Sequence, residues 1–215
     1  MRRAIVLFLL SAAATAHADG HEIWIGDSAR ALRTSSANAL TDDGLFGGSA
    51  GYAHLIGRDI VPHLELWAHG SVGGGSATGE MFQTLDTKID TFQMTVGGGV
   101  RYALHSRVVA LARLDVGTLR AAVAIRDDAG HSASDSGWGA MTSAGVGLDL
   151  YAIRRPRFSL GLRFELSAVA TSSIPLTATP DSADEDTLQL DMTAAPLGSL
   201  SLSGPSFAFS LVGQL

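Results

Sequence analysis

The 215-residue sequence contains no cysteine and only one lysine, Lys88, and charged residues make up only 17% of it. The absence of cysteine excludes disulfides and thiolate metal sites. Aspartate and glutamate, 21 in number, exceed the 15 lysine and arginine residues, which argues against a nucleic-acid partner because such a partner favours a basic surface. A soluble enzyme would usually carry more surface charge than this chain does.

Long apolar runs are also missing beyond the first residues, so the sequence offers no transmembrane helix, which would need roughly 20 consecutive apolar residues. The first residues have the three parts of an export signal: a basic start (Arg2 and Arg3), an apolar stretch over 4–16, and the small-x-small site at 16–18. We expect residues 1–18 to be a cleaved signal peptide and residues 19–215 to be one exported domain.

Strict alternation of apolar and polar side chains is most regular over residues 158–168. One face of this segment would carry only apolar side chains: Phe158, Leu160, Leu162, Phe164, Leu166 and Ala168. The other face would carry Ser159, Gly161, Arg163, Glu165 and Ser167. Because successive side chains of a strand point to opposite faces, such a strand separates an apolar environment from a polar one.

The same alternation predicts three strand–turn–strand units, at about 45–72, 88–125 and 138–170, with turns at 57–59, 105–107 and 154–156. Longer polar segments separate the units, at about 73–86, 126–137 and from 172 onward. Short turns on one side and long loops on the other are typical of outer-membrane barrels.

A closed barrel of this kind needs an even number of strands, at least about eight, because lipid cannot satisfy the open edge of a sheet. The two remaining strands are predicted at about 21–32 and 200–215. An alternative uses residues 188–192 as the seventh strand and drops the N-terminal one, but it leaves the C-terminus on the long-loop side. The sequence therefore predicts an all-β fold, an eight-stranded antiparallel up-and-down transmembrane β-barrel.

Glycine-rich strand ends lead into aromatic or basic turns at 96–102, 145–151 and 159–164, and an alternating strand ends the chain at 206–215. In these features the sequence resembles the small OmpA/OmpX-type outer-membrane β-barrel proteins. The resemblance implies a cell outer-membrane location of the Gram-negative type, outer-membrane lipid as a partner, and a monomer. The expected role is structural or one of surface interaction, with ligands contacted through the external loops.

The polar strand faces should line the barrel, whose interior is only wide enough for its own side chains when there are eight strands. Isolated charges there would be costly, so we expect them to pair across the lumen. The predicted polar network consists of Glu65, Arg101, Arg113, Asp115, Asp149, Arg163 and Glu165. Within it we expect the pairs Arg113–Asp115 and Arg163–Glu165. The prediction is a lumen plugged by ion pairs, and the alternative is a small outer-membrane pore.

The two ends of the predicted barrel differ in charge. The short turns carry Arg58, Arg107, Arg154, Arg155 and Arg157. The long loops carry Asp42, Asp43, Glu80, Asp127, Asp128, Asp135, Asp181, Asp184, Glu185 and Asp186. This contrast favours different surroundings at the two ends.

The sequence gives weaker support to three other functions. A rim-sited lipid-modifying enzyme could use His131 and Ser132, or the histidines near Glu65, but no G-x-S-x-G elbow is present, so we expect no enzyme and no catalytic residue. The acidic run 181–186 lacks the ligand order of an EF-hand, so we expect no metal site and no cofactor. A soluble periplasmic lipocalin-like ligand binder would have its apolar faces turned inward.

Overall fold

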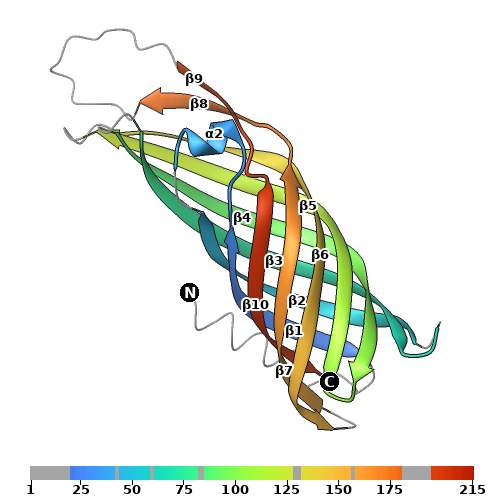
Figure 1. Cartoon of the computed structure of the whole chain (residues 1–215). Helices are drawn as coiled ribbons and strands as arrows, with labels where there is room; N and C mark the ends of the chain where they lie inside the picture. The colour runs from blue at the N-terminus through green and yellow to red at the C-terminus, as the bar shows by residue number, and fades with distance from the viewer. Residues whose placement is uncertain are drawn as a thin grey trace, which may run out of the picture.

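The computed structural model describes residues 20–41, 44–58, 61–81, 85–127, 132–155, 158–180 and 195–215. Eight long strands form a ring: β1 (His21–Arg30), β2 (Leu45–Arg58), β3 (Leu64–Met81), β4 (Leu85–His105), β5 (Val108–Asp127), β6 (Ser132–Arg155), β7 (Phe158–Thr171) and β10 (Gly204–Gln214). Three short elements lie at one end of the ring (Figure 1): α2 (Ser35–Asn38), β8 (Ile174–Pro180) and β9 (Ala195–Leu200). Among the described residues no helix has the length and apolar character to cross a membrane.

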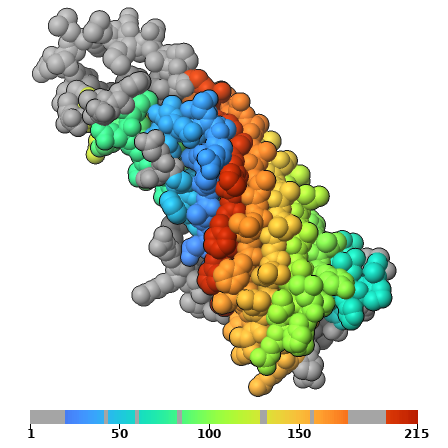
Figure 2. Space-filling view, in the orientation of Figure 1, coloured from blue at the N-terminus to red at the C-terminus, as the bar shows by residue number. Residues whose placement is uncertain are grey.

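The ring closes through two pairings. The first and last strands, β1 and β10, pair antiparallel, and β5 pairs with β6, so every ring strand has two neighbours. The space-filling view shows β10 lying between β1 and β7 (Figure 2). The predicted eight-stranded antiparallel up-and-down barrel is confirmed, with strands near 21–32 and 200–215. The alternative without the N-terminal strand is wrong, and residues 188–192 lie outside the described residues.

The strands are staggered around the ring. Register partners followed from Trp138 on β6 through β5, β4, β3, β2, β1, β10 and β7 return to β6 at Leu148, ten residues further along. A stagger of this kind tilts the strands, and with eight strands it leaves an interior that side chains can fill.

The apolar faces point outward. Phe158, Leu162 and Phe209 are 38–40% exposed, whereas Arg163 and Glu165 on β7 are 4% and 3% exposed. Only a surrounding apolar medium makes this arrangement favourable. In water the barrel would carry two free-energy costs, one for the buried charges and one for the exposed apolar side chains.

The ring strands are longer than predicted. The segments expected as loops at 73–86 and 126–137 are mostly strand, since β3 continues to Met81, β4 begins at Leu85 and β6 begins at Ser132. The sense of the alternation is reversed there: Lys88 and Arg120 point outward, while Ile89 is fully buried inside. Polar residues on the outer face made this part look like loops, although a strand that leaves the membrane for water is expected to show this reversal.

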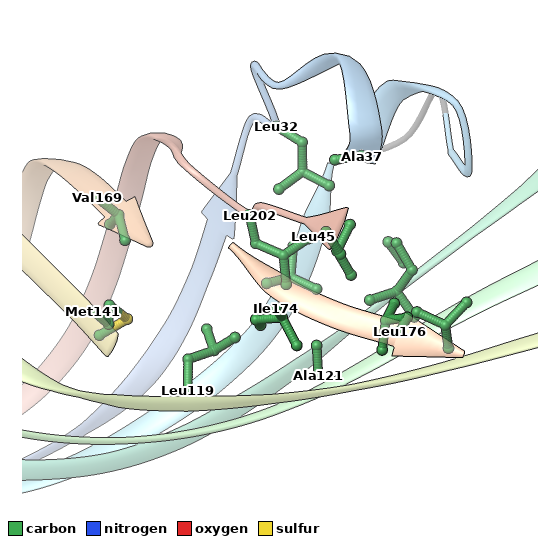
Figure 3. Close-up of a cluster of buried hydrophobic side chains, with 14 residues drawn as sticks. Leu32, Ala37, Leu45, Leu119, Ala121, Met141, Val169, Ile174, Leu176 and Leu202 are labelled. Atoms are coloured by element: carbon green, nitrogen blue, oxygen red, sulfur yellow. The ribbon is translucent and has the colours of Figure 1, made fainter. Parts of the chain in front are cut away.

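A buried apolar core fills the interior at the end where β8, β9 and α2 lie, which we call the loop end (Figure 3). Ring strands contribute Leu45, Ala77, Ile89, Leu119, Ala121, Val123, Met141 and Val169. The hairpin of β8 and β9 contributes Ile174, Leu176 and Leu200, and the neighbouring segments contribute Leu32, Ala37 and Leu202. The hairpin is attached to the ring by pairing between β8 and β6. We call these side chains the apolar layer.

Candidate functional site

Charged side chains occupy the interior between the apolar layer and the opposite end of the barrel, the turn end, where β2–β3, β4–β5 and β6–β7 are joined. Glu22 on β1 is fully buried and accepts hydrogen bonds from Arg101 on β4 and from Arg163 on β7, the latter at 2.9 Å. Arg163 also donates to both oxygens of Asp149 on β6, from Nε at 2.7 Å and from Nη2 at 2.8 Å. These four residues, the Glu22 cluster, join strands from opposite sides of the ring.

A second group of charges surrounds Asp115 on β5. Its Oδ2 accepts a hydrogen bond from the Ser143 hydroxyl at 2.9 Å and lies 3.3 Å from Arg113 Nε, and its Oδ1 contacts His69 Nε2. Arg113 also reaches Glu165 on β7, with Nη2 2.9 Å from Oε1. Arg113 therefore lies between two buried carboxylates, a geometry that offsets part of the cost of removing each charge from water.

Aromatic rings pack against the arginines. The Arg101 guanidinium lies 4.3 Å from the centre of the Trp67 ring, and that of Arg163 lies 5.5 Å from the Trp24 ring. Such cation–π contacts are strongest where water is excluded. The cavity among these side chains has a volume of about 20 Å³, which is room for about one water molecule.

The structure places six of the seven predicted network residues in these two groups. The seventh, Glu65, lies nearer the turn end, where its Oε2 accepts a hydrogen bond from Trp67 Nε1 at 3.0 Å and its Oε1 lies 3.7 Å from Arg58 Nε. The expected pair Arg113–Asp115 is present. The expected pair Arg163–Glu165 is not found among the described residues, because partners from other strands of the narrow barrel meet these two side chains: Arg163 pairs with Glu22 and Asp149, and Glu165 pairs with Arg113.

Sequence reasoning missed Glu22, the residue at the centre of the Glu22 cluster. The N-terminal strand has an irregular pattern because Trp24 lies inside while Ile23 and Ile25 lie outside or half-buried. A signal was nevertheless present: Glu22, Trp24 and Arg30 are all even-numbered, so they share the buried face of β1.

The described interior groups do not form a nucleophile–base pair. His69 and Ser143 both contact Asp115, so the carboxylate lies between the histidine and the hydroxyl. Nucleophilic catalysis requires the base to contact the nucleophile directly. His131 and the acidic run 181–186 lie outside the described residues. Within the described ranges no group of three or more histidine, aspartate and glutamate side chains is placed to hold a metal ion.

A closed ring of tilted antiparallel strands, with apolar side chains outside and ion pairs inside, defines a transmembrane β-barrel of the outer-membrane type. Residues 4–194 match the model of the outer membrane protein beta-barrel domain, and the chain belongs to this family. In such barrels the short turns face the periplasm and the longer loops face outward.

Solved outer-membrane barrels are similar to this chain at low sequence identity. One is Ail, the attachment invasion locus protein of Yersinia pestis, solved in complex with the heparin analogue sucrose octasulfate. It is 15% identical to this chain, with 90% of this chain and 95% of that chain covered and a TM-score of 0.46. Neisserial surface protein A is 10% identical, with 91% and 96% covered and a TM-score of 0.41. A major outer membrane protein from Thermus thermophilus is 12% identical, with 89% and 99% covered and a TM-score of 0.42. No curated protein matches this chain.

Proposed function

We propose that this protein is a closed outer-membrane barrel with a structural and surface-contact role, and that its lumen carries no solute. The observation that carries the proposal is the buried Glu22 cluster, which joins β1, β4, β6 and β7 across the interior. A path for water or ions through this level would require these paired side chains to separate, because the cavity among them has a volume of only about 20 Å³.

The apolar layer supports the same proposal independently. It lies in series with the Glu22 cluster, so a solute would have to pass both. Ile89, Leu119 and Ile174 are each fully buried in it. Hydrophobic constrictions exclude water and thereby stop ion flow even where they are not sterically sealed.

In this proposal the loop end of the barrel makes the surface contacts. Ring strands β4, β5 and β6 extend there and carry exposed polar side chains such as Lys88, Arg120 and Ser136, and β8, β9 and α2 lie beside them (Figure 1). Connecting segments presented by a rigid barrel are the usual place of recognition. We propose further that residues 1–18 are removed on export, that the mature barrel is a monomer in outer-membrane lipid, and that it has no enzymatic activity.

Conductance in planar bilayers tests the closed lumen. The barrel is extracted from outer membranes in detergent, its folded state is checked by heat-modifiable migration on unboiled gels, and it is inserted beside a general porin as a positive control. We expect no steady openings while the porin conducts. Steady openings of porin size from the barrel alone would contradict the proposal and favour the small-pore alternative.

A further inference from the structure

We propose that the turn end of the barrel carries a binding groove for the phosphate headgroup of an anionic phospholipid in the periplasmic leaflet. The groove has a volume of about 870 Å³ and lies between the β2–β3 turn, the β4–β5 turn and the end of β6. Its lining includes four side chains that are cationic or able to become so, His63, His105, Arg107 and Arg154, and no acidic residue is among its described lining residues.

The groove is held in shape by contacts between the turns. The backbone N–H of Ala103 donates to the carbonyl of His63 at 3.1 Å, which ties the β2–β3 turn to β4. Arg154 Nη1 donates to the carbonyl of Ser106 at 2.8 Å, and the backbone N–H of Tyr151 donates to the carbonyl of Arg107 at 2.9 Å. These contacts join the β4–β5 turn to β6, so the groove is part of the fold.

Arg107 is the side chain most available to a ligand. It is exposed, and among the described residues no carboxylate or carbonyl accepts a hydrogen bond from its guanidinium. A guanidinium offers a planar pair of donors that matches two oxygens of a phosphate. The rings of His63 and His105 add donors beside it.

His63 stands in an unfavourable backbone conformation. Its φ is +69°, and it is the one described residue other than glycine with a positive φ. Leu64 N–H donates to the carbonyl of Val61 at 2.9 Å, so Pro62 and His63 occupy the centre of a tight turn whose third position normally takes glycine. The imidazole packs edge-on against Tyr102 with centroids 6.3 Å apart. Strained backbone of this kind often occurs at binding sites.

The lining also points to a lipid as the source of the phosphate. Tyr102 and Leu104 on β4 are exposed on the outer face and continue the apolar surface of the barrel to the edge of the groove. A ligand with acyl chains and an anionic head would contact both parts, whereas a free phosphate would contact only the cations. Basic residues beside a membrane-spanning element are a recognised attraction for anionic lipid.

Native mass spectrometry of the full barrel in an uncharged detergent tests the groove, with phosphatidylglycerol, phosphatidylcholine or inorganic phosphate added. We expect the barrel to retain phosphatidylglycerol in preference to phosphatidylcholine. Replacing Arg107 by alanine should weaken retention of phosphatidylglycerol by about tenfold, because the substitution removes a charged hydrogen-bond donor. Arg126→Ala, which removes an exposed arginine at the loop end of β5, is the matched control and should leave retention unchanged.

A second variant separates binding from folding. His63→Gly relieves the positive φ, so the barrel should unfold no more readily than the wild type while it retains less phosphatidylglycerol. Equal retention by the wild type and Arg107→Ala, or equal weakening by Arg107→Ala and Arg126→Ala, would overturn the proposal. Displacement of the lipid by inorganic phosphate at equal concentration would show that the groove binds a soluble anion, and it would overturn the proposal that the ligand is a phospholipid. None of these outcomes depends on whether the lumen conducts.

Discussion

Replacing Glu22 by glutamine tests whether the buried ion pairs hold the barrel together. The substitution keeps the shape of the side chain but removes the charge that faces Arg101 and Arg163. Breaking a buried ion pair by removing one partner typically costs about 3–5 kcal/mol. Arg163 retains two hydrogen bonds to Asp149, and Arg101 retains its contact with the Trp67 ring, so we expect a loss near the lower end, about 3 kcal/mol.

The assay is reversible unfolding by urea in phospholipid vesicles, followed by tryptophan fluorescence. Glu80→Gln is the matched control, since Glu80 is exposed near the end of β3 and should change the free energy of unfolding by less than about 0.5 kcal/mol. The double variant with Arg101→Met should lose less than the sum of the two single losses, because the two residues interact directly. A loss below about 1 kcal/mol for Glu22→Gln would refute the reasoning, since a buried charge pair of this kind cannot be so weak to break.

Two further predictions concern the outer face and the apolar layer. Asp27 points outward on β1 between its register partners Gly48 and Phe209, within the apolar surface. Asp27→Leu should therefore raise the free energy of unfolding in vesicles by about 1–2 kcal/mol, and a decrease in the same urea titration would show that this carboxylate has a partner. Ile174 is fully buried in the apolar layer, so Ile174→Ala should weaken the attachment of the β8–β9 hairpin by about 2–5 kcal/mol. The measurement is the rate of limited proteolysis of the hairpin with the ring still folded, with exposed Ser199→Ala as the control, and equal rates for the two variants would contradict the prediction.

The barrel could be predicted from the sequence because the alternation within each strand indicates which of its faces meets lipid and which meets the interior. Residues 158–168 specify by alternation alone which side chains face lipid, and β7 has this register in the structure. The loop end was missed because its outer face is polar in the same way as a loop. The reversed alternation is visible in the sequence at Ile89, Leu119 and Val123. These residues indicate a strand above the membrane only when the length of the membrane-spanning part is known.

The partners inside the lumen could not be predicted in the same way. Alternation identified Arg101, Arg113 and Arg163 as inward-facing, yet it contains no information on which carboxylate each would meet. Glu22 is 79 residues from Arg101 and 141 residues from Arg163 in the sequence, and these distances are bridged only when β1 closes the ring against β10.

By itself, the sequence determined the strand period and the outward direction of the apolar faces, and it predicted eight strands and an export signal at 1–18. The strand period and the direction of the apolar faces are local properties, because the period of two and the chemistry of each residue suffice to set them. The number of strands also required the condition that the barrel closes. Only the tertiary structure decided which charges pair, how the hairpin and α2 complete an apolar core, and where two turns and the end of β6 enclose a basic groove. Those properties depend on the stagger of the closed ring, which brings together side chains that no spacing along the chain relates.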